Sequence, residues 1–238
     1  MWESSPPSSL SLQPGEVHVW RLVLDAPVER FMALLQPDEL DRANRFYFER
    51  DRKHFTVARG FLRLLLGRYL DTDGARLTFS YGAYGKPSLE GAPALRFNMS
   101  HSHGMALYAL THEREIGVDV ERIRADFTSD DIARRFFSPS EVDVLCRLPS
   151  ADRVDGFFRC WTRKEAYIKA TGRGLSQALD SFDVTLGPHE GAALLRNEDG
   201  SHERWTLIDI EVGPGYAGAA AVEGAVSSIR YLNADDTY

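Results

Sequence analysis

Residues 115–122, EIGVDVER, alternate apolar and polar side chains with a period of two. This period predicts a β-strand with one buried face. The buried face is Ile-Val-Val, so the opposite face presents Asp119 and Glu121 side by side. Two carboxylates on one strand face repel each other and gain nothing for folding. Either they lie on an exposed strand edge, where charge discourages aggregation, or something holds them together.

Composition excludes several classes of function. The 238 residues, 43% of them hydrophobic, can form one large domain or two small ones. A net charge of −7 argues against general nucleic-acid binding. No apolar run is long enough to span a membrane. The two cysteines form no CxxC motif, which suits a reducing, cytoplasmic compartment. Residues 1–14 lack the pattern of a signal peptide, and we expect a polar, disordered segment there.

The order of the predicted elements indicates an α+β protein. They are a strand at 16–24, a helical segment at 36–70 with a break near Asp51, strands at 76–80, 95–100 and 104–110, helices from Ser138 and over 152–171, and strands within 180–233. The polar turn at 111–115 predicts a hairpin that pairs strand 104–110 with the acidic strand. Residues 37–41 and 139–143 are similar and each opens a helical stretch before strands. We therefore predict two similar α+β halves, 15–112 and 113–238.

The helix at 152–171 carries a third acid. Glu165 falls on the stripe marked by Trp161 and Ile168, with Lys169 one turn further on. The pair has two interpretations: a solvated i,i+4 ion pair, or a buried acid that needs Lys169 or a metal ion as its partner. Together with Asp119 and Glu121, Glu165 gives three hard oxygen donors, which suit Mg²⁺.

Groups that could bind phosphate occur elsewhere in the chain. Residues 81–87, YGAYGKP, predict a tight turn that projects Lys86, and residues 97–102, FNMSHS, place Asn98, Ser100, His101 and Ser102 at a strand end. Arginines line the first helical region: Arg42, Arg45, Arg52 and Arg59. Each feature alone is equally typical of a plain turn or a solvated helix face. Zinc at His101 and His103 lacks supporting ligands and is excluded.

These motifs, taken in order, resemble the Sfp-type 4′-phosphopantetheinyl transferases. The resemblance rests on YGKP (84–87), FNMSHS (97–102), IGVDVE (116–121), RRFFSPSE (134–141) and WTRKEAYIKATGRGL (161–175), and it spans residues 15 to 225. Met99 and His103 depart from the usual pattern without touching an expected ligand. The resemblance implies a pseudo-dimer of two α+β halves with coenzyme A in the cleft between them.

The resemblance also implies the reaction and its residues. The family moves the phosphopantetheine arm of coenzyme A onto a carrier-protein serine and releases adenosine 3′,5′-bisphosphate. The matching positions imply Asp119, Glu121 and Glu165 as Mg²⁺ ligands; Lys169, His101 and Ser100 at the pyrophosphate; and Lys86, Pro87, Asn98 and Arg42 at the nucleotide end. Mg²⁺, Lys169 and His101 would stabilise the charge. Glu165 is the expected acceptor of the serine proton, with Glu121 as an alternative.

Partners and competing functions follow from the same interpretation. We expect a monomer that binds acidic carrier proteins through a basic and apolar surface: Arg122, Arg124, Arg134, Arg135 and Phe136-Phe137. Fatty-acid, polyketide, non-ribosomal peptide and aminoadipate-reductase carriers all remain possible partners.

Two other functions compete with this interpretation. One alternative is a coenzyme A-binding or nucleotide-binding module without activity. Another is an Mg²⁺-dependent pyrophosphate hydrolase, which would cleave coenzyme A without an acceptor.

Overall fold

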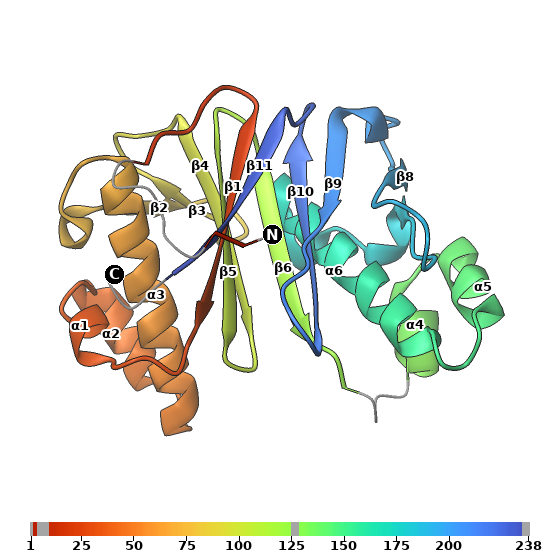
Figure 1. The fold of residues 1–238 in the computed structure, drawn as a ribbon, viewed down its shortest axis with the longest axis horizontal. Helices are drawn as coiled ribbons and strands as arrows, with labels where there is room; N and C mark the ends of the chain where they lie inside the picture. The colour runs from red at the N-terminus through yellow and green to blue at the C-terminus, as the bar shows by residue number, and fades with distance from the viewer. Residues whose placement is uncertain (1, 4–9, 125–128, 235–238) are drawn as a thin grey trace.

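The computed structural model describes residues 2–3, 10–124 and 129–234. Two sheets stand side by side between two groups of helices, so the layers run helix, sheet, sheet, helix (Figure 1). The first sheet has the strand order β11-β1-β5-β4, with β11 parallel to β1 and the other pairs antiparallel. The second sheet, β6-β10-β9, is antiparallel. The α+β class predicted from the sequence is confirmed.

The elements before Arg114 are β1 (Glu16–Val23), α1 (Glu29–Met32), α2 (Pro37–Asn44), α3 (Glu49–Tyr69), β2 (Phe79–Tyr81), β3 (Pro87–Leu89), β4 (Leu95–Ser102) and β5 (Met105–His112). Those after it are β6 (Ile116–Arg122), α4 (Ser129–Phe136), α5 (Pro139–Arg147), α6 (Arg153–Thr171), β7 (Asp183–Val184), β8 (Leu194–Arg196), β9 (Trp205–Asp209), β10 (Tyr216–Glu223) and β11 (Ser228–Asn233). Short 3₁₀ turns lie at Gly74–Arg76, Gly174–Ser176, Leu179–Ser181 and His202–Arg204. No helix among the described residues is both long and apolar enough to cross a membrane.

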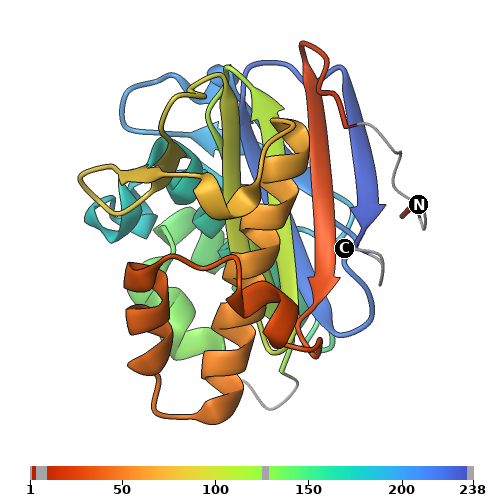
Figure 2. The same cartoon turned by 90° about the vertical axis from the view of Figure 1, so that its left-hand side faces the viewer.

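Three cores hold the layers together. Helix α3 lies across the outer face of the first sheet (Figure 2). Its Phe61 and Leu65 belong to one core with Trp20 and Tyr108. Helix α6 and the strands of the second sheet form a matching core on the other side. Between the sheets, the apolar face of β6 packs against strands β1 and β5. Because β6 buries its apolar face against the first sheet, its acidic face turns toward α6.

Several local predictions are confirmed. The alternating segment is strand β6, and its three apolar residues are fully buried. Strand β5 is central and apolar on both faces. Helix α6 ends at Gly172, whose φ of 69° favours glycine. The capping box at the start of α5 is present, with Ser138 N–H donating to Glu141 Oε2 at 2.9 Å.

One prediction about a connection is wrong. Strands β5 and β6 form no hairpin: β5 is already paired with β1 and β4 on its two edges, so the chain crosses to the second sheet and β6 pairs with β10. The predicted break in the helical segment is present: it lies at residues 45–48, a few residues before Asp51, where Phe48 is extended and precedes the first residue of α3.

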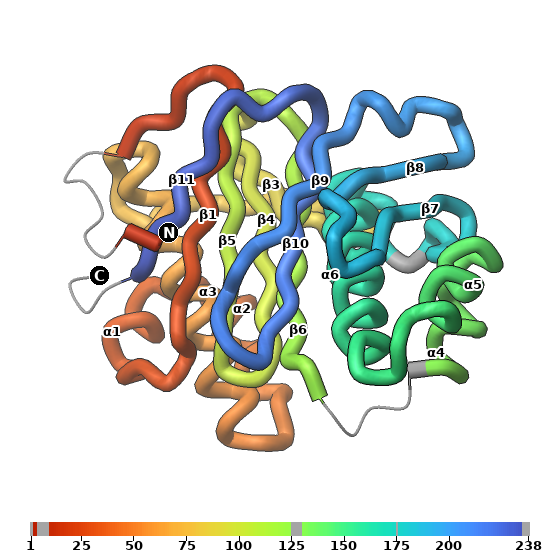
Figure 3. Tube along the Cα trace, turned by 45° about the vertical axis from the view of Figure 1, so that its right-hand side comes forward, coloured from red at the N-terminus to blue at the C-terminus, as the bar shows by residue number. Residues whose placement is uncertain are grey.

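The ends of the described chain meet at the first sheet. Strand β11 lies beside β1, although the sequence division places it in the second half (Figure 3). Within the segment expected to be disordered, Glu3 forms a bridge to Leu232 and an ion pair with Arg230 at 2.6 Å. The last strand, β11, therefore belongs to the sheet formed by strands that precede residue 113.

Candidate active site

Strand β6 and helix α6 approach each other unusually closely at Gly117. A Cβ atom there would lie 2.1 Å from Ala166 O and 2.4 Å from Ala170 N. Only glycine permits this contact between backbones. The next residue on the same face of β6 is Asp119, so it lies against the turn of α6 that carries Glu165 and Lys169.

Asp119 is buried, with 2% of its surface exposed. Its Oδ1 accepts hydrogen bonds from Lys169 Nζ at 2.6 Å and from Ser100 Oγ at 2.8 Å. Its Oδ2 is buried with no hydrogen-bond partner. An exposed acidic edge is therefore excluded for Asp119, and a buried carboxylate oxygen without a donor is unfavourable unless a cation or another donor reaches it.

Glu121 and Glu165 complete what we call the carboxylate cluster: Asp119, Glu121 and Glu165. Burial raises the pKa of Glu165 to about 7, and the charges of Asp119 and Glu121 add to this against the opposing effect of Lys169. Burial and the charge of Asp119 also raise the pKa of Glu121. Lys169 forms its ion pair with Asp119, so the solvated Glu165–Lys169 pair is not what the structure shows.

The donor set of the carboxylate cluster fits a hard divalent cation. The cluster contains an unpartnered buried oxygen and two acids whose pKa is raised by burial and further by neighbouring negative charge. A bound divalent cation would supply a partner for the oxygen and favour the ionised form of both acids. Within the described ranges, no group of three His, Cys, Asp or Glu side chains is already close enough to hold a metal ion. Lys169 supplies the positive charge at Asp119 in this arrangement.

A cavity of about 430 Å³ lies between α2, α3 and β4. It brings together Arg42, Pro87 and His101 of the predicted set. The Arg42 guanidinium lies over the ring of Phe55 at 5.2 Å. Partial removal from water lowers the pKa of His101, and the nearby Lys169 charge lowers it further, so the imidazole is a neutral hydrogen-bonding group at pH 7.

The lining of this cavity includes an acid that the sequence analysis did not single out, Glu39. Buried Glu39 accepts from Arg63 Nε at 2.6 Å and also from Arg59 Nε. Arg59 Nη2 in turn donates to Tyr81 Oη at 3.0 Å. The sequence signal was present only as an acid at the third position of α2, which forms a capping box with Gln36.

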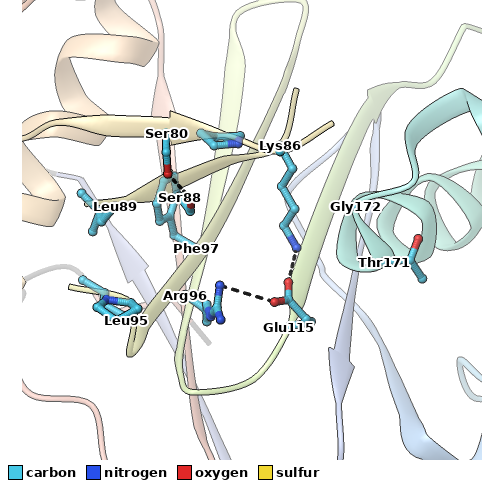
Figure 4. Close-up of a pocket in the computed structure, with 13 residues that line it drawn as sticks. Ser80, Lys86, Ser88, Leu89, Leu95, Arg96, Phe97, Glu115, Thr171 and Gly172 are labelled. Atoms are coloured by element: carbon cyan, nitrogen blue, oxygen red, sulfur yellow. Dashed lines mark hydrogen bonds and ion pairs between the residues drawn. The ribbon is translucent and has the colours of Figure 1, made fainter. Parts of the chain in front are cut away.

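Lys86 and Asn98 lie outside this cavity. Lys86 Nζ donates to Glu115 Oε2 at 2.6 Å, at a second cavity of about 440 Å³ that Pro87 also lines (Figure 4). It also donates to Ala170 O at 2.8 Å. Arg96 also faces Glu115, at 3.5 Å. Asn98 Oδ1 accepts from Val118 N–H at 3.0 Å. Both side chains therefore connect the two halves in this structure.

The sequence analysis also did not single out two buried basic side chains of α6, Lys164 and Arg163. Lys164 is fully buried, forms an ion pair with Glu141 at 2.8 Å and donates to Leu179 O and Phe182 O. Arg163, equally buried, binds Asp209 and Thr185. The Arg163–Asp209 bond connects α6 to β9, in the sheet that carries Asp119, and the bonds of Lys164 connect α6 to α5 and to residues 179–182. A run of polar residues in the sequence does not show which of the side chains are buried.

A third cavity, of about 350 Å³, lies on the outer side of Glu121. Arg122 and Arg124 form its basic rim, and its apolar lining is Ile132, Phe157, Phe158 and Trp161. Arg134 and Arg135 are exposed on α4. A negatively charged group and an apolar side chain can both be accommodated next to the carboxylate cluster.

Comparisons with known proteins find matches over most of the chain. Residues 115–221 match the family model of the 4′-phosphopantetheinyl transferase superfamily, and residues 20–113 match the N-terminal model of 4′-phosphopantetheinyl transferases. The 4′-phosphopantetheinyl transferase HetI of a Nostoc species is 41% identical over 94% of this chain and 94% of the relative. The 4′-phosphopantetheinyl transferase Sfp of Bacillus subtilis is 32% identical over 83% of this chain and 88% of the relative. A holo-(acyl-carrier-protein) synthase structure from Bacillus anthracis aligns with 47% of this chain and 96% of its own, at 20% identity and a TM-score of 0.39.

Proposed function

The chain belongs to the 4′-phosphopantetheinyl transferase family, and on this premise we propose that it moves the phosphopantetheine arm of coenzyme A to a serine of an apo carrier protein. The observation that carries the proposal is the carboxylate cluster beside Lys169, in which Asp119 Oδ2 is buried without a partner. The serine Oγ forms a bond to the β-phosphorus, and the bond from this phosphorus to the bridging oxygen breaks. Adenosine 3′,5′-bisphosphate is the leaving group.

We assign Asp119, Glu121 and Glu165 as the residues that would hold Mg²⁺. When bound there, the ion would supply positive charge that neutralises the pyrophosphate. The support is the hard oxygen donors, the unpartnered oxygen and the raised pKa of both glutamates. All three features are present in the folded chain without a metal ion.

Lys169, Ser100 and His101 are assigned to the pyrophosphate. Lys169 Nζ contacts Asp119 and Ser100 and is partly exposed, so it lies where a negatively charged ligand can reach it. Its ammonium stabilises charge that increases on the leaving group. Glu165 accepts the serine proton in this proposal, because it is the acid of the carboxylate cluster that shares helix α6 with Lys169. Glu121 is the alternative base.

The cavity lined by Arg42, Pro87 and His101 is assigned to the nucleotide end of coenzyme A. Its volume and its charged rim suit an adenosine phosphate. Lys86 and Asn98 belong to the nucleotide end by family resemblance. In this structure Lys86 would have to leave Glu115 and Ala170 to bind there, and Asn98 holds the backbone of β6.

The carrier protein is proposed to dock at the third cavity. Its basic rim suits an acidic partner, and its apolar lining suits a nonpolar side chain next to the reactive serine. The enzyme itself has a net charge of −7, so only a local basic surface can attract such a carrier. We further propose a monomer that acts in the cytoplasm, which suits its two unpaired cysteines, Cys146 and Cys160.

The test is the intact mass of an apo carrier protein after incubation with the protein, coenzyme A and Mg²⁺. We expect the mass of one phosphopantetheine group to be added and adenosine 3′,5′-bisphosphate to appear in equal amount. Release of this bisphosphate without a carrier would indicate a hydrolase instead. Binding of coenzyme A with neither product would indicate a module without activity.

A further inference from the structure

Strands β4 and β6 lie next to each other across the two sheets without a backbone ladder between them. Each pairs through its backbone with another strand, β4 with β5 and β6 with β10. Side chains from alternate positions of β4 bridge the gap instead. Asn98 binds Val118 N–H, Ser100 binds Asp119, and Ser102 binds Glu121. We call these three bonds the β4–β6 seam.

Ser102 has a particular place in the seam. Its Oγ donates to Glu121 Oε2 at 2.8 Å and accepts from Arg122 N–H at 3.3 Å. The side chain is buried, so water does not readily replace these bonds. An ionised carboxylate only accepts hydrogen bonds, and Glu121 Oε2 at 2.8 Å lies closer to the hydroxyl than His103 Nδ1 at 3.3 Å, so the hydroxyl proton is assigned to Glu121. One hydroxyl therefore connects the end of the Glu121 side chain to the backbone of the following residue.

We infer that Ser102 is a positioning residue that holds the Glu121 carboxylate in the orientation needed to bind the divalent cation. This inference rests on the proposed metal site. Glutamate has three rotatable side-chain bonds, and fixing them before the ion arrives reduces the entropy lost on binding. Hydrogen bonds that orient a ligating carboxylate commonly change metal affinity by about ten- to a hundredfold.

If Ser102 only stabilised the packing of β4 against β6, its removal would have a different effect from the one expected for a positioning residue. If the hydroxyl only joined the two strands, its loss would lower the melting temperature and leave metal affinity unchanged. The two roles therefore separate in a binding measurement that needs no carrier protein and no turnover.

The experiment measures Mn²⁺ binding from the electron paramagnetic resonance signal of the free ion. Each protein is titrated alone and with saturating coenzyme A, after subtraction of the metal bound by coenzyme A itself. We expect Ser102→Ala to weaken binding about tenfold. Ser102→Thr keeps the hydroxyl and should bind within about twofold of the wild type. The matched control is Ser181→Ala, which removes a serine hydroxyl bonded to Ala178 O in a 3₁₀ turn.

The outcomes separate the inference from the function on which it rests. Wild-type affinity in folded Ser102→Ala overturns the positioning role. If the alanine variant does not fold, Ser102→Cys keeps the size with a weaker donor, and wild-type affinity in that variant overturns the role equally. Asp119→Ala serves as the reference: if it binds Mn²⁺ as well as the wild type, the metal site itself is assigned wrongly.

Discussion

Lys169 places its ammonium 2.6 Å from Asp119 Oδ1, on the neighbouring strand, rather than on Glu165, four residues earlier in its own helix. The pair joins the helix that carries one acid of the carboxylate cluster to the strand that carries the other two. Loss of the Asp119 charge should therefore affect both glutamates.

The first prediction concerns Asp119→Asn. We expect transfer to fall by about a hundredfold or more, because the variant removes a buried charge at the reacting centre. The protein should stay folded, since asparagine has the same size and can still accept from Ser100. Transfer is measured by carrier mass at saturating Mg²⁺, and folding by circular dichroism. Turnover at the wild-type level would contradict the assignment of Asp119.

Arg42 and Lys169 should differ kinetically. Arg42→Ala should raise the KM for coenzyme A with little change in kcat, because the ground state and the transition state share a nucleotide contact. Lys169→Ala should lower kcat, because its ammonium faces charge that develops during transfer. Steady-state kinetics with a fixed carrier measures both. The same pattern in both variants would disprove this division of the site.

Lys86→Ala should mainly affect stability. The ammonium joins Glu115 to the last turn of α6, and both partners lose a bond in the variant. We expect the free energy of unfolding in urea to fall by about 1–2 kcal/mol. The control Lys53→Ala removes an exposed i,i+4 pair with Glu49 and should change stability by less than about 0.5 kcal/mol. A rise in KM equal to that of Arg42→Ala would instead place Lys86 on coenzyme A.

Stability of the metal-free protein should depend on pH through Glu165. Its pKa is raised to about 7 in the fold from an ordinary 4.5, so the native state binds more protons than the unfolded state between these values. The contribution of Glu165 to stability is therefore greatest below pH 4.5 and is lost as pH rises through about 7. Glu165→Gln should reduce this loss, as measured by the change in unfolding free energy between pH 5 and 8. A profile identical to the wild type would contradict the raised pKa.

The proposed docking surface predicts a selective effect on the carrier. The double variant Arg124→Glu with Arg135→Glu should raise the KM for the carrier and leave that for coenzyme A unchanged. The effect should shrink at high salt, because exposed charges are screened. A matched charge reversal, Arg30→Glu with Arg76→Glu on the other half, is the control. Unchanged carrier kinetics at low ionic strength would place the docking surface elsewhere.

Local features of this protein could be predicted from the sequence because the physics that sets them is local. The alternation in β6 and the glycine at the end of α6 each act within a few residues. The same pattern placed Asp119 and Glu121 on one face, and helical spacing placed Glu165 near Lys169. The family motifs then related these segments to one site.

Contacts between distant segments could not be predicted in this way. Nothing near residue 116 indicates that β6 pairs with β10, and a polar turn before it favoured a hairpin that does not form. Lys86 follows the family motif, yet its ammonium lies on Glu115 because the end of α6 supplies a carbonyl there. The burial of Lys164 likewise depends on carbonyls that only tertiary packing brings close.

The pairing of β11 with β1 also has a consequence for folding during synthesis of the protein. During synthesis β1 emerges early, and the strand that covers its outer edge emerges only after α6 and strands β7 to β10. Until then the outer edge of β1 is unpaired. Unpaired strand edges promote aggregation of nascent chains. When β11 pairs with β1, it connects the C-terminal segment to the first sheet. A fragment that ends at residue 112 would therefore lack one strand of this sheet.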